Sequence, residues 1–295
     1  MKLATIRVDG TTRAVRAGGD LLVDLGAAEL GEFLASADWE QRAARAGLTG
    51  RAGLTGRAKS SGQAGSAYAA AGADFATLVP NPSKVVCVGL NYRNHIQEMG
   101  RDLPEYPTLF AKFADCLIGD GDDIARPPET GQFDWEVELA VVIGRPVRRA
   151  SEDEAKAAIA GFTVLNDITC RDWQFRTKEW LQGKIWDSST PVGPYLVTPD
   201  DLPGGTAPEL PVRLTVDGEV MQSDTTADLL FKPVDLVRYI STIIRLNPGD
   251  IIATGTPGGV GQARKPPRFL TGGETVVTEI EGLGTLTNTV SKEVA

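Results

Sequence analysis

The sequence contains a single histidine, His95, among its 295 residues. It also has only three cysteines, Cys87, Cys116 and Cys170, which are too few and too widely spaced for a disulfide framework or a zinc site. We interpret them as small buried residues of a protein in a reducing compartment, for which the cytoplasm fits best. Because enzymes of this length usually have several imidazoles, any role for His95 has to follow from its surroundings.

Long apolar segments and an excess of positive charge are missing too. No apolar run reaches the ~18 residues that a membrane-spanning helix needs. The first residues, MKLATIRVDG, have no apolar h-region, so we expect no signal peptide. The net charge is −9, whereas nucleic acids and anionic membranes require clustered cations. We therefore expect a protein that binds neither nucleic acid nor a membrane.

The first quarter of the chain differs in composition from the rest. Residues 1–26 alternate between apolar and polar groups around Gly-containing turns, which predicts a small β-meander, and residues 27–47 look helical. The hexad RAGLTG then occurs twice in tandem over residues 45–56, and we interpret it as a surface loop duplication. The Gly/Ala/Ser-rich stretch 59–72 is typical of a linker. Together these patterns predict a small β-rich N-terminal domain with its linker over residues 1–75.

Residues 76–295 consist mainly of short β-type runs separated by Gly and Pro: VVCVGL, EVELAVVIG, FTVLND, VRLTVDGEVM, DIIATGTP, ETVVTEIEG and GTLTNTV. Helical patterns occur near 151–160 and 233–244, and the first begins with the capping sequence S-E-D-E. Many short strands with few helices predict an α+β, β-rich domain, built as a sandwich or a rolled sheet.

The clearest functional signal is the stretch FDWEVELAVVIG. On a strand, Glu136 and Glu138 project from the same face, ~7 Å apart. The strand continues as an apolar run, which indicates burial on both faces. Two carboxylates at the mouth of a buried strand repel each other, so either their pKa values rise or a cation lies between them. The alternative for an isolated Glu-X-Glu pair is an exposed strand end.

A third carboxylate favours the cation. The strand predicted over 162–165 ends in Asn166-Asp167, again at a buried edge. Three carboxylates without a nearby histidine or cysteine form an all-oxygen site, which suits Mg²⁺, Mn²⁺ or Ca²⁺ rather than zinc. Three protein ligands leave coordination positions open for water and substrate, as in a catalytic metal site.

Taken together, five stretches resemble the fumarylacetoacetate hydrolase family. They are G-L-N-Y-x-x-H-x-x-E at 89–98, D-W-E-x-E-L at 134–139, G-F-x-x-x-N-D-x-x-x-R-D-x-Q at 161–174, G-K-x-x-D with the following P-V-G-P at 183–194, and N-P-G-D-I-I-x-T-G-T-P-x-G-V-G at 247–261. Each is weak alone, but their order along the chain is specific. The resemblance is to prokaryotic acylpyruvate hydrolase-like members. It implies a mixed β-roll catalytic domain, usually homodimeric, behind a small N-terminal domain.

The resemblance also implies the metal and the reaction. It assigns Mg²⁺ or Mn²⁺ to Glu136, Glu138 and Asp167, and the oxygen donors make Ca²⁺ a further candidate. The substrate would be a small 2-oxo or 2,4-dioxo acid, an acylpyruvate such as fumarylpyruvate, whose carboxylate and 2-oxo oxygens chelate the metal. Lewis-acid stabilisation of the enolate then allows hydrolysis of a C–C bond. We therefore predict a hydrolase acting on carbon–carbon bonds.

His95 and Glu98 are spaced i, i+3 and lie side by side if their segment is helical. The resemblance makes this pair the base that activates water, a role that the ordinary pKa of imidazole suits. It makes Lys184 a group that neutralises the developing oxyanion. Outside this context, an His-x-x-Glu pair is more often structural, and a lysine more often lies at the surface.

The remaining candidates are substrate contacts. Arg171 and Gln174 match positions that face the distal acyl end, although Arg171 could equally be a structural ion-pair partner. Thr256 matches a substrate-contacting threonine within TGTPGGVG, where a phosphate-binding loop is excluded because the Walker Lys-Ser/Thr pair is absent. The same metal–enolate chemistry also serves oxaloacetate decarboxylation and 2-hydroxymuconate-type isomerisation or hydration. A non-catalytic scaffold is disfavoured because no expected ligand is missing.

Overall fold

The computed structural model describes residues 1–52, 64–98, 100 and 102–293, with only the backbone given at 47–52 and at Glu98. The predicted β-meander is confirmed. Its antiparallel strands are β1 (Lys2–Val8), β2 (Thr11–Gly18) and β3 (Leu21–Asp24). The first turn is Asp9-Gly10, whose φ angles of 49° and 76° match a two-residue hairpin turn.

Three details of the N-terminal region differ from the sequence predictions. The helical segment consists of two helices, α1 (Leu30–Leu34) and α2 (Trp39–Ala52). The first copy of the hexad, residues 45–50, lies inside α2, so its interpretation as a loop is wrong. Most of the second copy lies outside the described residues. The stretch interpreted as a linker contributes β4 (Ala67–Ala69), because its backbone pairs with the free edge of β3.

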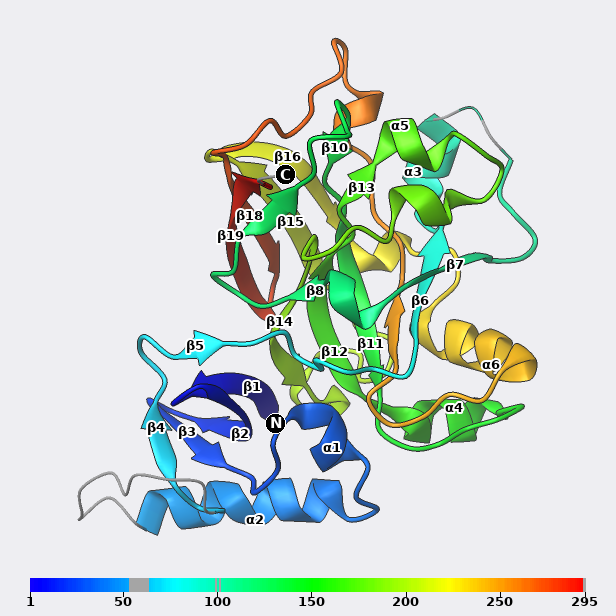
Figure 1. Cartoon of the computed structure of the whole chain (residues 1–295). Helices are drawn as coiled ribbons and strands as arrows, with labels where there is room; N and C mark the ends of the chain where they lie inside the picture. The colour runs from blue at the N-terminus through cyan, green and yellow to red at the C-terminus, as the bar shows by residue number, and fades with distance from the viewer. Residues whose placement is uncertain (53–63, 99, 101, 294–295) are drawn as a thin grey trace.

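One large mixed sheet joins this region to the rest of the molecule. Within the described residues it has twelve strands, and its main path runs β4-β3-β2-β1-β14-β12-β11-β17-β6-β7. Its further members are β5 (Asp74–Phe75), β6 (Val85–Gly89), β7 (Thr108–Lys112), β8 (Leu117–Ile118), β11 (Val137–Ile143), β12 (Ile159–Asn166), β14 (Thr190–Val197) and β17 (Ile251–Ala253). The pairing of β1 with β14 makes the N-terminal strands continuous with the body (Figure 1). The domain division near residue 75 stays a prediction.

A second sheet packs against the first. Its order is β16 (Glu219–Thr225), β15 (Pro211–Val216), β18 (Thr275–Ile280), β19 (Gly284–Lys292) and β9 (Ile124–Arg126). A short ladder joins β10 (Phe133–Asp134) to β13 (Thr169–Cys170). The remaining elements are helices α3 (Arg93–Glu98), α4 (Glu152–Ala158), α5 (Arg171–Gln174) and α6 (Pro233–Ile243), and 3₁₀ turns η1 (Ala114–Cys116), η2 (Trp180–Gly183), η3 (Pro199–Asp201), η4 (Thr226–Asp228) and η5 (Gly261–Ala263).

The centre of the body is the pair β11 and β12, in which every residue is buried. Alternate side chains of β11 pack on the two faces of the sheet. Leu139 and Val141 join the core formed with the second sheet, whereas Ala140 and Val142 pack with α1 and β1. Burial on both faces explains the apolar run of this strand. The predicted β-rich α+β fold is thus confirmed. None of the described helices has the length and apolarity to cross a membrane.

Candidate active site

The ends of β11 and β12 bring the predicted carboxylates together. The two strands are antiparallel, with Val137 opposite Asn166. This register places Glu136, just before β11, beside Asp167, just after β12. The Asp167 N–H donates to the Glu136 carbonyl at 2.9 Å, and the Glu136 N–H donates to Asn166 Oδ1 at 3.0 Å. The positions of these side chains are therefore set by the strand pairing itself.

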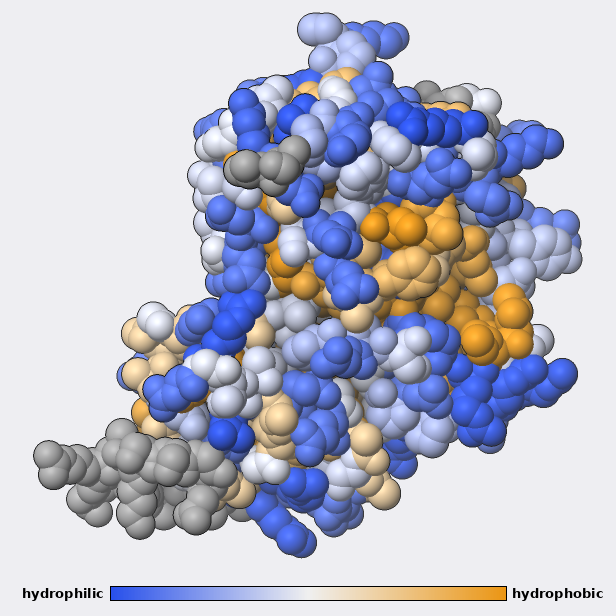
Figure 2. Space-filling view, in the orientation of Figure 1, coloured by the Kyte–Doolittle hydropathy of each residue, from blue (hydrophilic) through white to orange (hydrophobic). Residues whose placement is uncertain are grey.

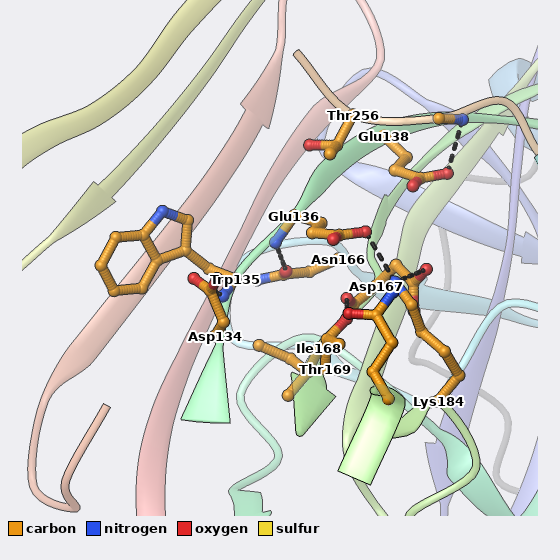
Figure 3. A network of polar contacts seen from close by, with 12 residues as sticks. Asp134, Trp135, Glu136, Glu138, Asn166, Asp167, Ile168, Thr169, Lys184 and Thr256 are labelled. Atoms are coloured by element: carbon orange, nitrogen blue, oxygen red, sulfur yellow. Dashed lines mark hydrogen bonds and ion pairs between the residues drawn. The ribbon is translucent and has the colours of Figure 1, made fainter. Parts of the chain in front are cut away.

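Glu136, Glu138 and Asp167 are buried, and one carboxylate oxygen from each lies within 4.8 Å of those of the other two (Figure 3). Glu136 and Glu138 both face the same cavity, as two residues of alternate positions on one strand should. The three acidic side chains therefore meet at one point, as the sequence analysis expected, and their binding of a metal ion stays a prediction.

Lys184 and Lys112 compensate the charge of two of these carboxylates. Lys184 Nζ lies between Glu136 Oε2 and Asp167 Oδ2, at 2.8 Å from each. Lys112 Nζ is 2.9 Å from Asp167 Oδ1, and neither lysine is appreciably exposed. Burial disfavours a charge on Asp167, but the two lysines outweigh it and lower the pKa of Asp167 below its ordinary value.

Glu138 has a different environment. It accepts a hydrogen bond from the Gly255 N–H at 2.8 Å, and no cation among the described residues forms an ion pair with it. Burial, with the negative charges of Asp167 and Glu136, raises the pKa of Glu138 well above its ordinary value. Glu138 is thus the carboxyl group of the site whose ionised form has no paired cation among the described residues.

Arg171 completes the cluster. Its Nη1 is 2.7 Å from Glu136 Oε1 and its Nε is 2.8 Å from Asp134 Oδ2. Counting these residues, four carboxyl groups face three cations, so the cluster has one surplus negative charge when all four are ionised. Buried oxygen donors with a surplus negative charge fit a hard divalent cation, which would be held by Glu136, Glu138 and Asp167.

A cavity of about 360 Å³ opens beside the cluster. Seven of the predicted site residues line it: His95, Glu136, Glu138, Arg171, Gln174, Lys184 and Thr256. Asp167 is fully buried, is paired with Lys184 and does not line the cavity. His95 is on α3, so the condition under which the i, i+3 pair lies side by side is met, and Glu98 ends that helix. The predicted contact between the two side chains lies outside the described residues.

Sequence analysis missed two charged residues of the site, Lys112 and Asp134. Lys112 follows the apolar residues of TLFAKF, but it is the only buried residue of β7, whose other residues are half-buried or exposed, so the local sequence carries no signal of its burial. Asp134 was noted only as part of a motif. The aromatic wall of the cavity was also missed, where Phe110 packs on Trp180 with ring centroids 5.7 Å apart.

The class of protein follows from a β-rich fold with a buried acidic cluster where strands β11 and β12 meet, beside a cavity that β6 and β7 also line. The chain belongs to the fumarylacetoacetate hydrolase family, since the family model described as fumarylacetoacetate (FAA) hydrolase C-terminal matches residues 84–291. Members of this family are enzymes and include hydrolases, isomerases and tautomerases.

Individual relatives differ in the reaction that their names give. The chain is 46% identical over 217 residues to oxaloacetate tautomerase Fahd2a, mitochondrial, of Rattus norvegicus, a match that covers 73% of this chain and 69% of the relative. The fumarylacetoacetate hydrolase of Exiguobacterium antarcticum has a TM-score of 0.81 and 29% identity, covering 99% of this chain and all of that one. Maleylpyruvate hydrolase from Sphingobium sp. SYK-6, in complex with manganese(II) and pyruvate, has a TM-score of 0.78 and 25% identity, with both chains fully covered.

The protonation of Glu138 leads to a prediction about metal uptake. Because its pKa is raised, the metal-free protein keeps a proton on this carboxyl group to a higher pH than an ordinary glutamate does. A divalent ion binds the carboxylate form, so Mn²⁺ binding should release protons and should tighten as the pH rises. Titration calorimetry in buffers of different ionisation enthalpy measures this release. Mn²⁺ affinity that is independent of pH from acid to neutral conditions would contradict the prediction.

Proposed function

We propose that the chain is a divalent-metal-dependent enzyme acting on small 2-oxo acids, and that its reaction is the keto–enol tautomerisation of oxaloacetate. The observation that carries the metal chemistry is the buried trio Glu136, Glu138 and Asp167, with its surplus negative charge, at the wall of a cavity. The choice among reactions is supported by the oxaloacetate tautomerases at 46% identity. Keto–enol isomerisation is one of the alternatives that the sequence left open.

In this proposal, Mg²⁺ or Mn²⁺ held by the trio supplies Lewis-acid stabilisation of negative charge on the 2-oxo oxygen of the substrate. Lys184 adds a second positive group on the same side. Burial disfavours the charge of Lys184, but Asp167 and Glu136 outweigh it and raise its pKa, so this lysine stays protonated. It therefore stabilises an oxyanion and does not act as a base.

His95 is the proposed proton carrier. It lines the cavity, and imidazole has an ordinary pKa near neutrality. It would take a proton from C3 of oxaloacetate while the electron pair of that C–H bond forms the C2–C3 double bond and charge moves onto the 2-oxo oxygen. Return of a proton to that oxygen completes the enol. Arg171, at the other end of the acidic cluster, would bind the distal carboxylate, and Gln174 and Thr256 would contact the substrate.

Hydrolysis of acylpyruvates such as fumarylpyruvate is the second candidate. It is supported by the placement of His95 on the cavity wall, where imidazole could activate water, and by the likeness to a maleylpyruvate hydrolase. Glu98 would orient the imidazole in either reaction. Both candidates need the same metal, so loss of activity on chelation does not separate them.

Paired assays distinguish the two reactions. We expect the protein with Mg²⁺ or Mn²⁺ to accelerate decay of the oxaloacetate enol by ~10²-fold or more over the spontaneous rate. Release of pyruvate from acetyl-, fumaryl- and maleylpyruvate is measured in parallel. Rapid pyruvate release without acceleration on oxaloacetate would replace the tautomerase by the hydrolase.

Replacing His95 tests the proton carrier. We expect His95→Asn to lower turnover by ~10²-fold or more, with folding and Mn²⁺ affinity retained, because only the titrating group is lost. Asn94→Ala, one residue earlier on the exposed side of α3, is the matched control and should keep wild-type turnover. Unchanged turnover in His95→Asn would remove this residue from the mechanism.

A homodimer remains part of the proposal. Figure 2 shows apolar side chains gathered on the face that carries β6 and β7, and β7 is an edge strand of the large sheet. Phe113, directly after β7, and Leu181 in η2 are exposed large apolar side chains. Such an area fits a second copy of the chain better than water.

A further inference from the structure

The side chain of Asp134 makes an unusually large number of hydrogen bonds. Its side chain is fully buried and accepts four hydrogen bonds. Oδ1 accepts from the N–H groups of Trp135 at 2.8 Å and Gly261 at 2.7 Å. Oδ2 accepts from the Gln262 N–H at 3.1 Å and from Arg171 Nε at 2.8 Å. All four partners are donors, so only a carboxylate satisfies them together.

Two of these donors belong to the 3₁₀ turn η5, which covers the cavity. Val260, Gln262 and Ala263 of this segment line the cavity wall. At Gly261 the packing is so close that a Cβ atom would lie 2.7 Å from Asp134 Oδ1 and 1.9 Å from the Arg268 carbonyl. Glycine is therefore required for the carboxylate to reach the turn. The Asp134 side chain thus fixes one wall of the cavity by binding the backbone N–H groups of η5.

Besides the Trp135 N–H, the remaining donor is Arg171, and not every nitrogen of its guanidinium group has a partner. Nε donates to Asp134, and Nη1 contacts Glu136 Oε1 at 2.7 Å and Gln174 Oε1 at 3.1 Å. Nη2 is buried and has no hydrogen-bond partner among the described residues, although the side chain lines the cavity. A buried guanidinium nitrogen without a partner points to a missing ligand, and a carboxylate matches its geometry.

We propose that Asp134 is a positioning residue that holds Arg171 at the cavity wall and, through η5, holds the adjoining wall, so that the site selects 2-oxo acids with a distal carboxylate. This inference rests on the proposed function. Without the Asp134 charge, the carboxylate partner left to Arg171 among the described residues is Glu136, and the contact that fixes Nε is weakened. The substrate would then lose its second anchor, whereas the reacting end of the site would remain.

The test compares oxaloacetate with 2-oxobutanoate, which has the same 2-oxo acid end but no distal carboxylate. For Asp134→Asn we expect the KM for oxaloacetate to rise ~10-fold with kcat within ~3-fold of wild type, since uniform binding is lost. Deuterium exchange at C3 of 2-oxobutanoate, followed by NMR, should be as slow as in the wild type. Trp135→Phe removes a different tie to the same wall, the Nε1 bond to the Gly259 carbonyl, and should lower stability without this change in KM.

Two further variants keep the test decisive. Arg171→Lys retains a cation but lacks the guanidinium fork, so it should raise the KM as Asp134→Asn does, even if Asp134→Asn fails to fold. In an Arg171→Met background, Asp134→Asn should add no further rise in KM, because the two residues act as one unit. A wild-type KM in Asp134→Asn or Arg171→Lys, or additive effects in the double variant, would overturn the inference. If the wild type itself fails to act on oxaloacetate, the proposed function is what fails.

Discussion

Glu138→Gln is expected to yield a metal-free protein that is more stable than the wild type and that no longer functions. Glu138 is a buried carboxylate without a cationic partner, and its raised pKa reports the cost of its charge. Glutamine removes this charge and can still accept the Gly255 N–H bond. We expect the melting temperature of the metal-free protein at neutral pH to rise by ~2 °C or more, while Mn²⁺ affinity falls by ~10²-fold or more and turnover falls with it.

Glu136→Gln is the matched control because the same chemical change should have the opposite effect on stability. Glu136 is paired with both Lys184 and Arg171, so its loss leaves two buried cations short of a partner. We expect this variant to lose metal binding as well, but to be destabilised by about 3 kcal/mol. Scanning calorimetry of both proteins in chelator measures the contrast. If Glu138→Gln were destabilised to the same extent, the Glu138 carboxylate would have a stabilising partner within the protein. That result would weaken the case for a metal ion bound by Glu138.

The second large effect is expected from Lys112→Met. Lys112 is almost fully buried, and its ammonium group contacts Asp167 Oδ1 and donates to the carbonyls of Ile168 and Lys184. Methionine has a similar volume but leaves Asp167 with one cation and two buried carbonyls without their donor. We expect a loss of about 3–5 kcal/mol in the free energy of unfolding, measured by urea denaturation at neutral pH.

Lys156→Met is the control for this variant. Its partner Glu152 lies one helical turn away and both side chains are largely in solvent. Solvent-exposed pairs contribute little, so the urea midpoint should stay in place. Equal midpoints for Lys112→Met and the wild type would mean that the buried ammonium only offsets its own desolvation. The acidic cluster would then need another source of stability.

How much of the site could be predicted from the sequence depended on distance along the chain. Glu136 and Glu138 share a face because side chains on a strand alternate and the two residues are two positions apart. The capping sequence at Ser151 is equally local and is confirmed, whereas the helix that carries His95 was only a condition of its pairing with Glu98. The meeting with Asp167 needed one further assumption. The start of the strand that follows Glu136 has to pair with the end of the strand that precedes Asp167.

Longer-range features were beyond sequence patterns. The linker interpretation failed because β4 pairs with β3, a partner more than 40 residues away along the chain. The lysine at the base of the acidic cluster and the aspartate that receives four donors are recognised only when strands β7, β10 and β12 and turn η5 are placed together. Nothing in the residues around them indicates these partners.

The sequence by itself determined the shared face of Glu136 and Glu138, because strand periodicity acts over a few residues, and the family to which the chain belongs, because five motifs occur in a specific order. The tertiary structure decided which carboxylate remains uncompensated, which lysines neutralise the others and which edge of Arg171 is left for a ligand. Those are differences in burial and in charge–charge distance, and both depend on strand pairings between distant segments.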